Sequence, residues 1–540
     1  MGESIPDFRR RWFLFAGFIY VCVMILGFFT VQDYGMSWDE RFRFIDADSK
    51  LEYYDGLLSG KAVSPPSSNY PGLYDLPLAW IDRLLPDFGT RSQKGHVWSL
   101  CFGLAGLFSA WRLTARLGGE RAGFFGLIFL VTLPRYYGHM FMNPKDLPLA
   151  AMYLLGIWAL VELLVRLPKM PLRYVVAIGL AAGLAMSVRV AGFLILCYFG
   201  LFICLHFLMK NLQARQSGST LKRGDLQVDL IYWGQRGLLA GLIASVILFI
   251  FWPALHTNPF ESASQAVATV SRYGWDGMVL MDGMFWKAID LPIYYVPYWI
   301  LVTLPEHILI LLVCFVALGG CSIYGIIRKG SSLPGNVLGI VLVTFSSAFP
   351  VIYLLAKDPV LYDGARHFLF AIAPLACVSA LALEKALRLC PTAWIRRSIV
   401  CVVLLGVTLT AAEMVRLHPY QYVYFNYVSG GLEAAYNRDE TDYWGLSHKE
   451  AGEWLNDYAR EIDPGGERIF KVHQRYTRWM LKEALDPEHF KMWQPREGAD
   501  FFVSITRFNM HLSYPEATLL HVVEREGVPL CFVYAFEGSP

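Results

Sequence analysis

Apolar runs close to the length of a membrane span recur through most of this 540-residue chain. A transmembrane helix needs about 20 mainly apolar residues. Stretches such as 12–30 and 238–252 carry almost no charge, and 17% of the whole chain is charged, against roughly 25% in ordinary soluble proteins. We predict an α-helical polytopic membrane domain over residues 1–415, with about eleven transmembrane helices. The predicted spans are 12–31, 95–111, 122–138, 147–165, 174–188, 191–209, 237–254, 293–318, 334–355, 367–384 and 398–415.

Basic residues indicate which way the chain is inserted. Outside the long 31–94 loop, one set of connecting segments holds twenty Lys and Arg residues and the opposite set holds seven. Basic residues favour the cytoplasmic side, so we expect a cytoplasmic N-terminus and an exterior C-terminus. The first run follows Arg9–Arg11 without a cleavage site, which is typical of a retained signal anchor. The chain has no Asn-x-Ser/Thr sequence, which favours a bacterial inner membrane.

Three sizeable exterior pieces follow from this topology. The 31–94 loop has apolar residues at helical spacing and is expected to form interfacial helices, and 255–292 is a second exterior loop. Residues 416–540 read like a soluble, periplasmic domain with α/β structure. Strands are predicted at 468–472, 501–505, 519–523 and 532–536, with a helix at 450–460. A net charge of +2 without a basic stripe argues against nucleic acid as a partner.

Ionisable groups cluster at the exterior ends of the predicted spans, where charge indicates function. The first group is Asp39 and Glu40, just after the first span. Neighbouring helical residues point in different directions, so the two acids have separate roles, and one can serve as a general base toward an acceptor hydroxyl. The alternative is a pair of solvated loop acids.

The second group, between the third and fourth spans, contains His139, Asn143, Lys145 and Asp146. Asn-Pro is a turn signal, and the Asp146 side chain can cap the following helix. That cap leaves Lys145 unexplained, because an exterior lysine opposes the charge rule. Binding a phosphate would explain it.

The remaining groups are Arg189, at the turn between two short spans, and Tyr362, Asp363, Arg366 and His367, which open the tenth span. Arg189 can equally be a snorkelling or helix-pairing arginine. Asp363 and Arg366 can form a local ion pair, which is weak when exposed. Four rims of one face nevertheless carry ionisable groups, while the cytoplasmic loops carry only generic basic residues. We therefore predict one site at the outer membrane face.

Other motifs with known chemistry are absent from the sequence or have a structural reading. The chain has no glycine-rich phosphate loop, serine nucleophile elbow or His-Glu-x-x-His zinc motif. Asp46-Ala47-Asp48 has the form that nucleotide-sugar enzymes use to hold a metal, but it lies outside the membrane, where activated nucleotides are scarce. Gly179-x-x-x-Gly183 is a close helix-packing pattern.

At these residues the sequence resembles the GT-C superfamily of membrane glycosyltransferases, in particular bacterial relatives of protein O-mannosyltransferases and of lipid A aminoarabinose transferase. The resemblance lies in the acidic pair Asp39-Glu40, the Asn143-Pro-Lys-Asp-x-Pro148 turn and the run from Tyr362 to His367. A further stretch, 418–426 with 430–431 and 441–445, looks similar to the segment after the last helix in family members.

The resemblance implies an inverting transfer from a polyprenyl-phosphate sugar to an acceptor hydroxyl at the exterior face. It makes Asp39 the general base, with Glu40 orienting that base or the acceptor. Donor phosphate would be bound by Lys145, Arg189, Arg366 and His367. Supporting residues would be His139, Asn143, Asp146, Tyr362 and Asp363.

No cofactor is expected, because lysine and arginine can neutralise the phosphate, and the use of a divalent metal is left open. The expected partners are the bilayer, the lipid-linked donor and an acceptor protein, lipid or polysaccharide. A transporter or flippase of a lipid-linked sugar is the main rival, although such a protein would carry its charges near the midplane. An oligosaccharide ligase is the second.

Overall fold

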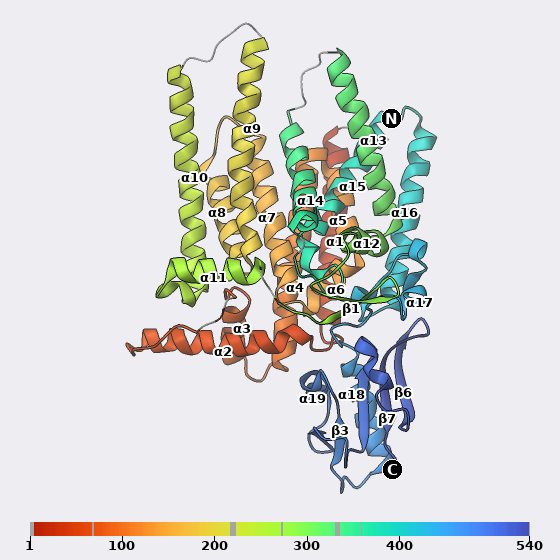
Figure 1. Cartoon of the computed structure of the whole chain (residues 1–540). Coiled ribbons are helices and arrows are strands. Elements are labelled where there is room, and N and C mark those ends of the chain that lie inside the picture. The colour runs from red at the N-terminus through yellow and green to blue at the C-terminus, as the bar shows by residue number, and fades with distance from the viewer. Residues whose placement is uncertain are drawn as a thin grey trace.

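The computed structural model describes residues 5–66, 68, 70–216, 223–271, 274–329, 335–357 and 359–538. Long helices run side by side in one bundle, with the N-terminus at one end and the C-terminus beyond the other end (Figure 1). A smaller domain of strands and helices stands at this second end. The chain therefore has the predicted fold class, a polytopic α-helical domain followed by a small α/β domain.

Nine helices in the described part of the chain are long and apolar enough to cross a membrane. They are α1 (Ile5–Thr30), α4 (Arg91–Gly118), α7 (Asp146–Leu164), α9 (Leu194–Gln216), α10 (Arg223–Phe251), α13 (Glu306–Lys329), α14 (Val337–Lys357), α15 (Leu369–Leu389) and α16 (Ala393–Arg416). The apolar stretches of α4, α7 and α15 are 67%, 83% and 89% buried, whereas those of α10 and α13 are 11% buried. Helices α4, α7 and α15 thus form the centre of the bundle, and the outer helices expose apolar faces to lipid.

Three of the eleven predicted spans differ from the observed helices. Span 122–138 is two helices, α5 (Glu120–Val131) and α6 (Pro134–Met142). The break follows from Pro134, which disfavours helical backbone in the preceding residue, and Leu133 is extended at φ −92° and ψ 96°. Span 293–318 is likewise divided before Pro305 into α12 (Tyr295–Thr303) and α13.

The third difference is α8 (Leu172–Met186), which has 15 residues where 174–188 was predicted to span. It packs between α7 and α10. A Cβ atom at Gly179 would lie 2.8 Å from the carbonyl oxygen of Ala240, and one at Gly183 would lie 2.8 Å from Cβ of Ile247. The two glycines therefore let α8 approach α10 closely, as their spacing predicts.

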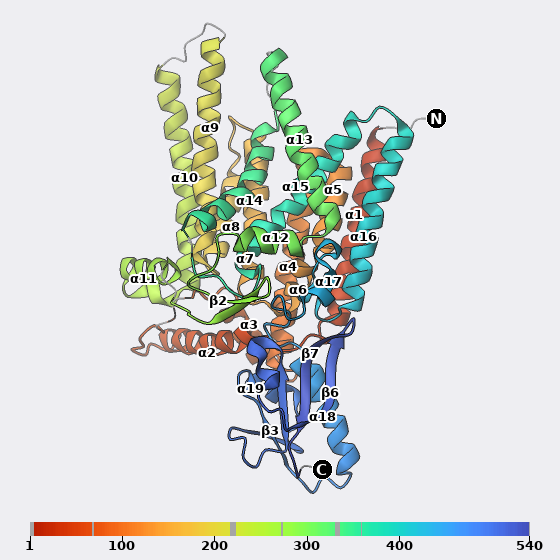
Figure 2. The ribbon, with the colours of Figure 1, turned by 45° about the vertical axis from the view of Figure 1, so that its right-hand side comes forward.

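Short elements cover the end of the bundle that faces the C-terminal domain. Helix α2 (Trp38–Leu58) lies crosswise to the bundle in both Figure 1 and Figure 2, above the level of the C-terminal domain. The others are α3 (Asp75–Leu84), α11 (Pro259–Ser271), the hairpin of β1 (Met278–Met281) and β2 (Met284–Lys287), and α17 (Gly431–Ala435). Short 3₁₀ segments are η1 (Val190–Phe193), η2 (Pro253–His256), η3 (Arg366–Phe368), η4 (Gln421–Val423), η5 (Tyr427–Ser429) and η6 (Arg507–Leu512). Left-handed residues Phe508 and Asn509 interrupt η6.

The C-terminal domain is built on a mixed sheet of five strands in the order β4-β3-β5-β7-β6. Strand β3 pairs in parallel with β4 and β5, while β7 pairs antiparallel with β5 and β6. Four of these strands overlap the four predicted ones, and β4, which is only four residues long, was not predicted. The strands are β3 (Phe470–His473), β4 (Phe490–Trp493), β5 (Phe501–Ile505), β6 (Thr518–Arg525) and β7 (Val528–Ala535).

Two helices complete this domain. The predicted helix 450–460 is α18 (His448–Ile462), which buries Ala451, Leu455 and Ala459 along one face. These positions are four residues apart and so lie on one side of a helix. Helix α18 packs with that side against β5, β6 and β7, and α19 (Arg478–Ala484) packs against α18.

Candidate functional site

The charged residues that were predicted from separate rims meet at one place. Asp39 lies in the first turn of α2, Asp146 begins α7, and Arg366 begins η3 ahead of α15. Nη1 of Arg366 lies 3.2 Å from Oδ2 of Asp39 and 3.2 Å from Oδ2 of Asp146. One guanidinium thus joins the start of a crosswise helix to the starts of the two most buried spans.

Two further cations complete the cluster. Nζ of Lys145 lies 2.9 Å from Oδ2 of Asp39, and Nη1 of Arg189 lies 3.0 Å from Oδ1 of Asp146. The side chain of Arg366 is 2% exposed, but those of Lys145 and Arg189 are 11% and 22% exposed. Lys145 and Arg189 therefore form the accessible side of the cluster.

The Asn143 turn sets the geometry at the start of α7. Oδ1 of Asn143 accepts hydrogen bonds from the backbone N–H groups of Lys145, at 3.0 Å, and of Asp146, at 2.8 Å. Asp146 does not form the helix cap that the sequence allowed as an alternative, because Asn143 satisfies these donors and the Asp146 carboxylate binds the arginines. His139, fully buried, lies 3.2 Å from Nδ2 of Asn143 and 3.3 Å from the Tyr443 hydroxyl, and so supports the turn.

Asp363 links this cluster to the C-terminal domain. Its carboxylate accepts hydrogen bonds from Nε of Arg366 at 2.9 Å, from Nη2 of Arg507 at 2.6 Å and from Nε1 of Trp444 at 3.2 Å. Asp363 has a left-handed backbone, with φ 58°, as does Gly364 next to it, with φ 65°. Such strain persists only where surrounding contacts hold it, and here three donors do so.

Arg507 and Glu440 were not predicted. Arg507 lies in the first turn after β5, and its Nη2 is 3.8 Å from Oε1 of Glu440. Both side chains are 5% exposed. No motif or composition change marks Arg507 in the sequence, whereas Glu440 directly precedes the 441–445 stretch that carries part of the resemblance.

Tyr362 and His367 pack beside the cluster without joining its ion pairs. Cζ of Arg366 lies 4.8 Å from the centre of the Tyr362 ring, and the rings of Tyr362 and His367 are 4.5 Å apart, edge to face. A cation over an aromatic face is stabilised by the ring quadrupole. Tyr362 therefore holds the Arg366 guanidinium in place, and the half-buried His367 packs against that tyrosine.

Electrostatics keeps Asp39 ionised. Burial raises the pKa of this carboxyl, but Lys145 and Arg366 outweigh burial and hold its pKa below the usual range. Glu440 behaves in the opposite way. Burial, together with the nearby negative charge of Asp363, raises the pKa of Glu440 to about 8, although Arg507 opposes this shift. Asp39 is therefore an anion at neutral pH, whereas Glu440 holds its proton more tightly than a free carboxyl does.

Glu40 faces away from the cluster. Its Oε2 accepts the backbone N–H of Ser37 at 2.6 Å in a capping box, and Oε1 lies 3.1 Å from Nε2 of His96. The side chain is fully buried. The structure thus separates the two adjacent acids, placing Asp39 among the cations and Glu40 at the start of α2.

The Glu40 environment gives a first prediction. Glu40→Gln is expected to keep most of the activity and stability of the chain, because glutamine can form the same capping box. Glu40→Ala removes the acceptor and is expected to cost about 1–2 kcal/mol of folding free energy, seen as a lower unfolding temperature in detergent. Loss of activity in a stable Glu40→Gln protein would instead assign Glu40 to the chemistry.

Both acids of the Asp46-x-Asp48 sequence form ion pairs with basic side chains. Asp46 lies 2.5 Å from Nη2 of Arg43 and 3.7 Å from Nζ of Lys50, and Asp48 lies 2.6 Å from Nη2 of Arg91. Within the described ranges of the chain, no group of three or more His, Cys, Asp or Glu side chains is arranged to hold a metal ion.

Comparison with known proteins finds similarity in structure only. No protein-family model matches the chain, and no curated protein matches its sequence. ArnT from Cupriavidus metallidurans bound to undecaprenyl phosphate matches at a TM-score of 0.47 and 12% identity, over 96% of this chain and 97% of ArnT. The Archaeoglobus fulgidus oligosaccharyltransferase AglB, in complex with an inhibitory peptide and a dolichol-phosphate, matches at 0.49 and 11%, over 98% and 74%. Both matches extend over most of this chain, at low sequence identity.

Proposed function

We propose that the chain is an inverting glycosyltransferase that moves a sugar from a polyprenyl-phosphate donor to an acceptor hydroxyl at the membrane face carrying the C-terminal domain. The observation that supports this most is the convergence of three cations on two carboxylates. Lys145 pairs with Asp39, Arg189 pairs with Asp146, and Arg366 pairs with both. Three cations at the rim of a membrane domain suit a lipid phosphate, whose charge grows as the glycosidic bond breaks.

The ion pairs suggest how Asp39 becomes a base. A carboxylate held by Lys145 and Arg366 is a weak base, because the same cations lower its pKa. A donor phosphate would compete for Lys145 and Arg366, and each contact moved from carboxylate to phosphate raises the basicity of Asp39. Donor binding and activation of the base are therefore linked through the same two side chains.

The reaction then balances without further reagents. The acceptor oxygen attacks the anomeric carbon from the face opposite the phosphate, and its proton passes to Asp39. The bond between the anomeric carbon and the phosphate oxygen breaks with inversion, and polyprenyl phosphate leaves with the bonding electron pair. Arg366 and Lys145 stabilise the added charge on the leaving phosphate, and Arg189 lies on the accessible side beside them.

An apolar pocket beside the cluster suits the lipid of the donor. It is lined mainly by aliphatic residues of α12, α14 and the segments next to them, among them Leu291, Leu354 and Leu361. Tyr295, which also lines it, donates a hydrogen bond to the carbonyl oxygen of Gly364 at 3.1 Å. The pocket is therefore adjacent to the segment that carries Asp363 and Arg366, so phosphate and lipid can be bound together.

A transfer assay tests the proposed function. The full chain, purified in detergent, would be given a panel of radiolabelled polyprenyl-phosphate sugars with an extract of envelope acceptors. We expect label to move from at least one donor to an acceptor. If label stays on every donor, and the donor crosses from one leaflet of proteoliposomes to the other, the chain is a flippase and not a transferase. Transfer of whole glycans but not of single sugars would indicate a ligase.

A further inference from the structure

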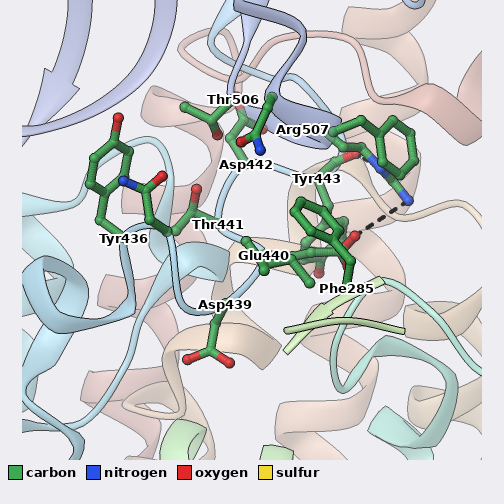
Figure 3. Close-up of a pocket in the computed structure, with 13 residues that line it drawn as sticks. Phe285, Tyr436, Asp439, Glu440, Thr441, Asp442, Tyr443, Thr506 and Arg507 are labelled. Atoms are coloured by element: carbon green, nitrogen blue, oxygen red, sulfur yellow. Dashed lines mark hydrogen bonds and ion pairs between the residues drawn. The ribbon is translucent and has the colours of Figure 1, made fainter. Parts of the chain in front are cut away.

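The C-terminal domain places one guanidinium group against the charged cluster of the membrane domain. Arg507 lies in the first turn after β5, and its side chain is 5% exposed. Nη2 of Arg507 donates to Oδ1 of Asp363 at 2.6 Å, and Nη1 donates to the carbonyl oxygen of Tyr443 at 2.6 Å. Figure 3 shows Arg507 at this place, joined to Glu440 by an ion pair. The C-terminal domain therefore binds the same carboxylate that binds Arg366.

Asp363 holds the Arg366 guanidinium by one edge. Oδ2 of Asp363 lies 2.9 Å from Nε and 2.9 Å from Nη2 of Arg366. The remaining nitrogen, Nη1, lies 3.2 Å from Asp39 and 3.2 Å from Asp146. A guanidinium is rigid and planar, so binding two of its nitrogens fixes the direction of the third. The position of the Asp363 carboxylate thus determines where Nη1 of Arg366 points.

Asp363 depends on contacts with other segments for its own position. Its backbone is left-handed, with φ 58°, which is uncommon for a residue other than glycine. Its side chain is buried, and Arg366 and Trp444 donate to Oδ2, whereas Arg507 donates to Oδ1. Without Arg507, Oδ1 would be a buried anionic oxygen that has lost its charged partner, and this cost favours rotation of the carboxylate. Such a rotation would turn Arg366 as well.

Arg507 is itself held by its surroundings. The two residues after it, Phe508 and Asn509, have left-handed backbones, with φ 56° and 55°. Cζ of Arg507 lies 4.9 Å from the centre of the Phe508 ring, and the Tyr443 carbonyl oxygen accepts from Nη1. Strained backbone persists where surrounding contacts fix it, and it concentrates at functional sites. The segment therefore presents Arg507 to Asp363 in one geometry.

We propose that Arg507 is a positioning residue for sugar transfer, through which the C-terminal domain orients Arg366. The role rests on the proposed function, because it takes Arg366 as a ligand of the donor phosphate. Arg507 acts through Asp363, since the buried side chains of Asp363 and Arg366 lie between it and Asp39. Its positive charge also offsets the negative charge of Asp363, so that Arg366 keeps more of its own charge for the phosphate.

A double-mutant cycle tests whether Arg507 acts through Arg366. Arg507→Gln removes the charge but keeps a hydrogen-bond donor, and we expect it to lower kcat/KM for the donor by about tenfold. Arg507→Lys keeps the charge without the planar fork, so we expect a loss of about threefold. In the Arg366→Lys background, either substitution at Arg507 is expected to change kcat/KM by less than about twofold, because residues that act as one unit are not additive.

Binding of a lipid phosphate gives a second measurement that needs no acceptor. Farnesyl phosphate, titrated into the full chain in nanodiscs, is expected to bind Arg507→Gln about tenfold more weakly than wild type, with the same lack of additivity. Arg525→Gln is the matched control. Arg525 also belongs to the C-terminal sheet, but its partners, the His418 carbonyl oxygen at 2.9 Å and Glu450 at 2.7 Å, lie outside the cluster. We expect this variant to equal wild type in both measurements.

Equal effects of Arg507→Gln in the wild-type and Arg366→Lys backgrounds would overturn the positioning role, and so would an Arg507→Gln protein with unchanged kcat/KM and binding. If Arg507→Gln does not fold, Arg507→Lys carries the cycle, and additivity there overturns the role. Weaker, non-additive binding of farnesyl phosphate in a chain that transfers no sugar would keep the link from Arg507 to Arg366 and overturn the proposed function alone. Sugar transfer with additive effects would do the reverse.

Discussion

Asp39→Asn is expected to lower kcat for sugar transfer by about 10²–10⁴-fold, the usual contribution of a general base. Asparagine fills nearly the same space as aspartate but takes no proton from the acceptor hydroxyl. The donor should bind at least as tightly as before, because Asp39 competes with phosphate for Lys145 and Arg366. A fall in kcat with an unchanged or lower donor KM is therefore the signature of this role.

The measurement is a steady-state transfer assay with the donor and acceptor varied separately. Glu40→Gln is the matched control, since it neutralises the adjacent acid, which lies in the capping box and not among the cations. Thermal unfolding of both variants checks the fold. An Asp39→Asn protein that transfers sugar at the wild-type rate would leave the cluster as a phosphate site and assign the base elsewhere.

The position of the charged cluster was predictable because its residues adjoin apolar runs in the linear sequence. A lysine or arginine at the predicted exterior end of a span is visible there as an exception to the charge rule. The pairing of these residues was not visible, because Asp39 and Arg366 are 327 positions apart and Arg366 is 220 positions from Asp146. Only the packing of α2, α7 and α15 brings them together.

Local sequence was a better guide to elements than to their breaks. The long apolar runs correspond to helices because a buried backbone must satisfy its own hydrogen bonds. The division of 122–138 at Pro134 and of 293–318 at Pro305 was overlooked, although proline marks both breaks. Arg507 shows that local sequence does not reveal contacts between distant parts of the chain. It bonds Asp363 from 144 positions away, and nothing in its own surroundings in the sequence signals that contact.

The link through Arg507 gives the C-terminal domain a part in the site. Asp363 receives donors from both sides, Arg366 from the membrane domain and Arg507 from the C-terminal domain. The two guanidinium groups share one carboxylate, so a shift of Arg507 changes the field that Arg366 experiences. The C-terminal domain thus contacts the same carboxylate that binds Arg366.

Arg366 carries the other large expected effect. Its guanidinium contacts Asp39, Asp146 and Asp363 within 3.2 Å. Arg366→Lys keeps the charge but replaces a planar fork by one ammonium group, which cannot hold the three carboxylates in the same geometry. We expect kcat/KM for the donor to fall by about 10²–10³-fold, comparable to removing one preorganised donor to a developing oxyanion, with little change in unfolding temperature.

Arg366→Met removes the charge as well and is expected to destabilise the chain by about 3–5 kcal/mol, because it leaves buried carboxylates without their shared cation. Arg388→Met is the control, since Arg388 lies near the other end of α15, with its side chain 64% exposed. Donor binding and thermal unfolding, measured side by side, separate the two effects of Arg366. If Arg366→Lys binds and uses donor as wild type does, Arg366 only holds the aspartates, and the phosphate must be bound by Lys145 and Arg189 on the exposed side of the cluster.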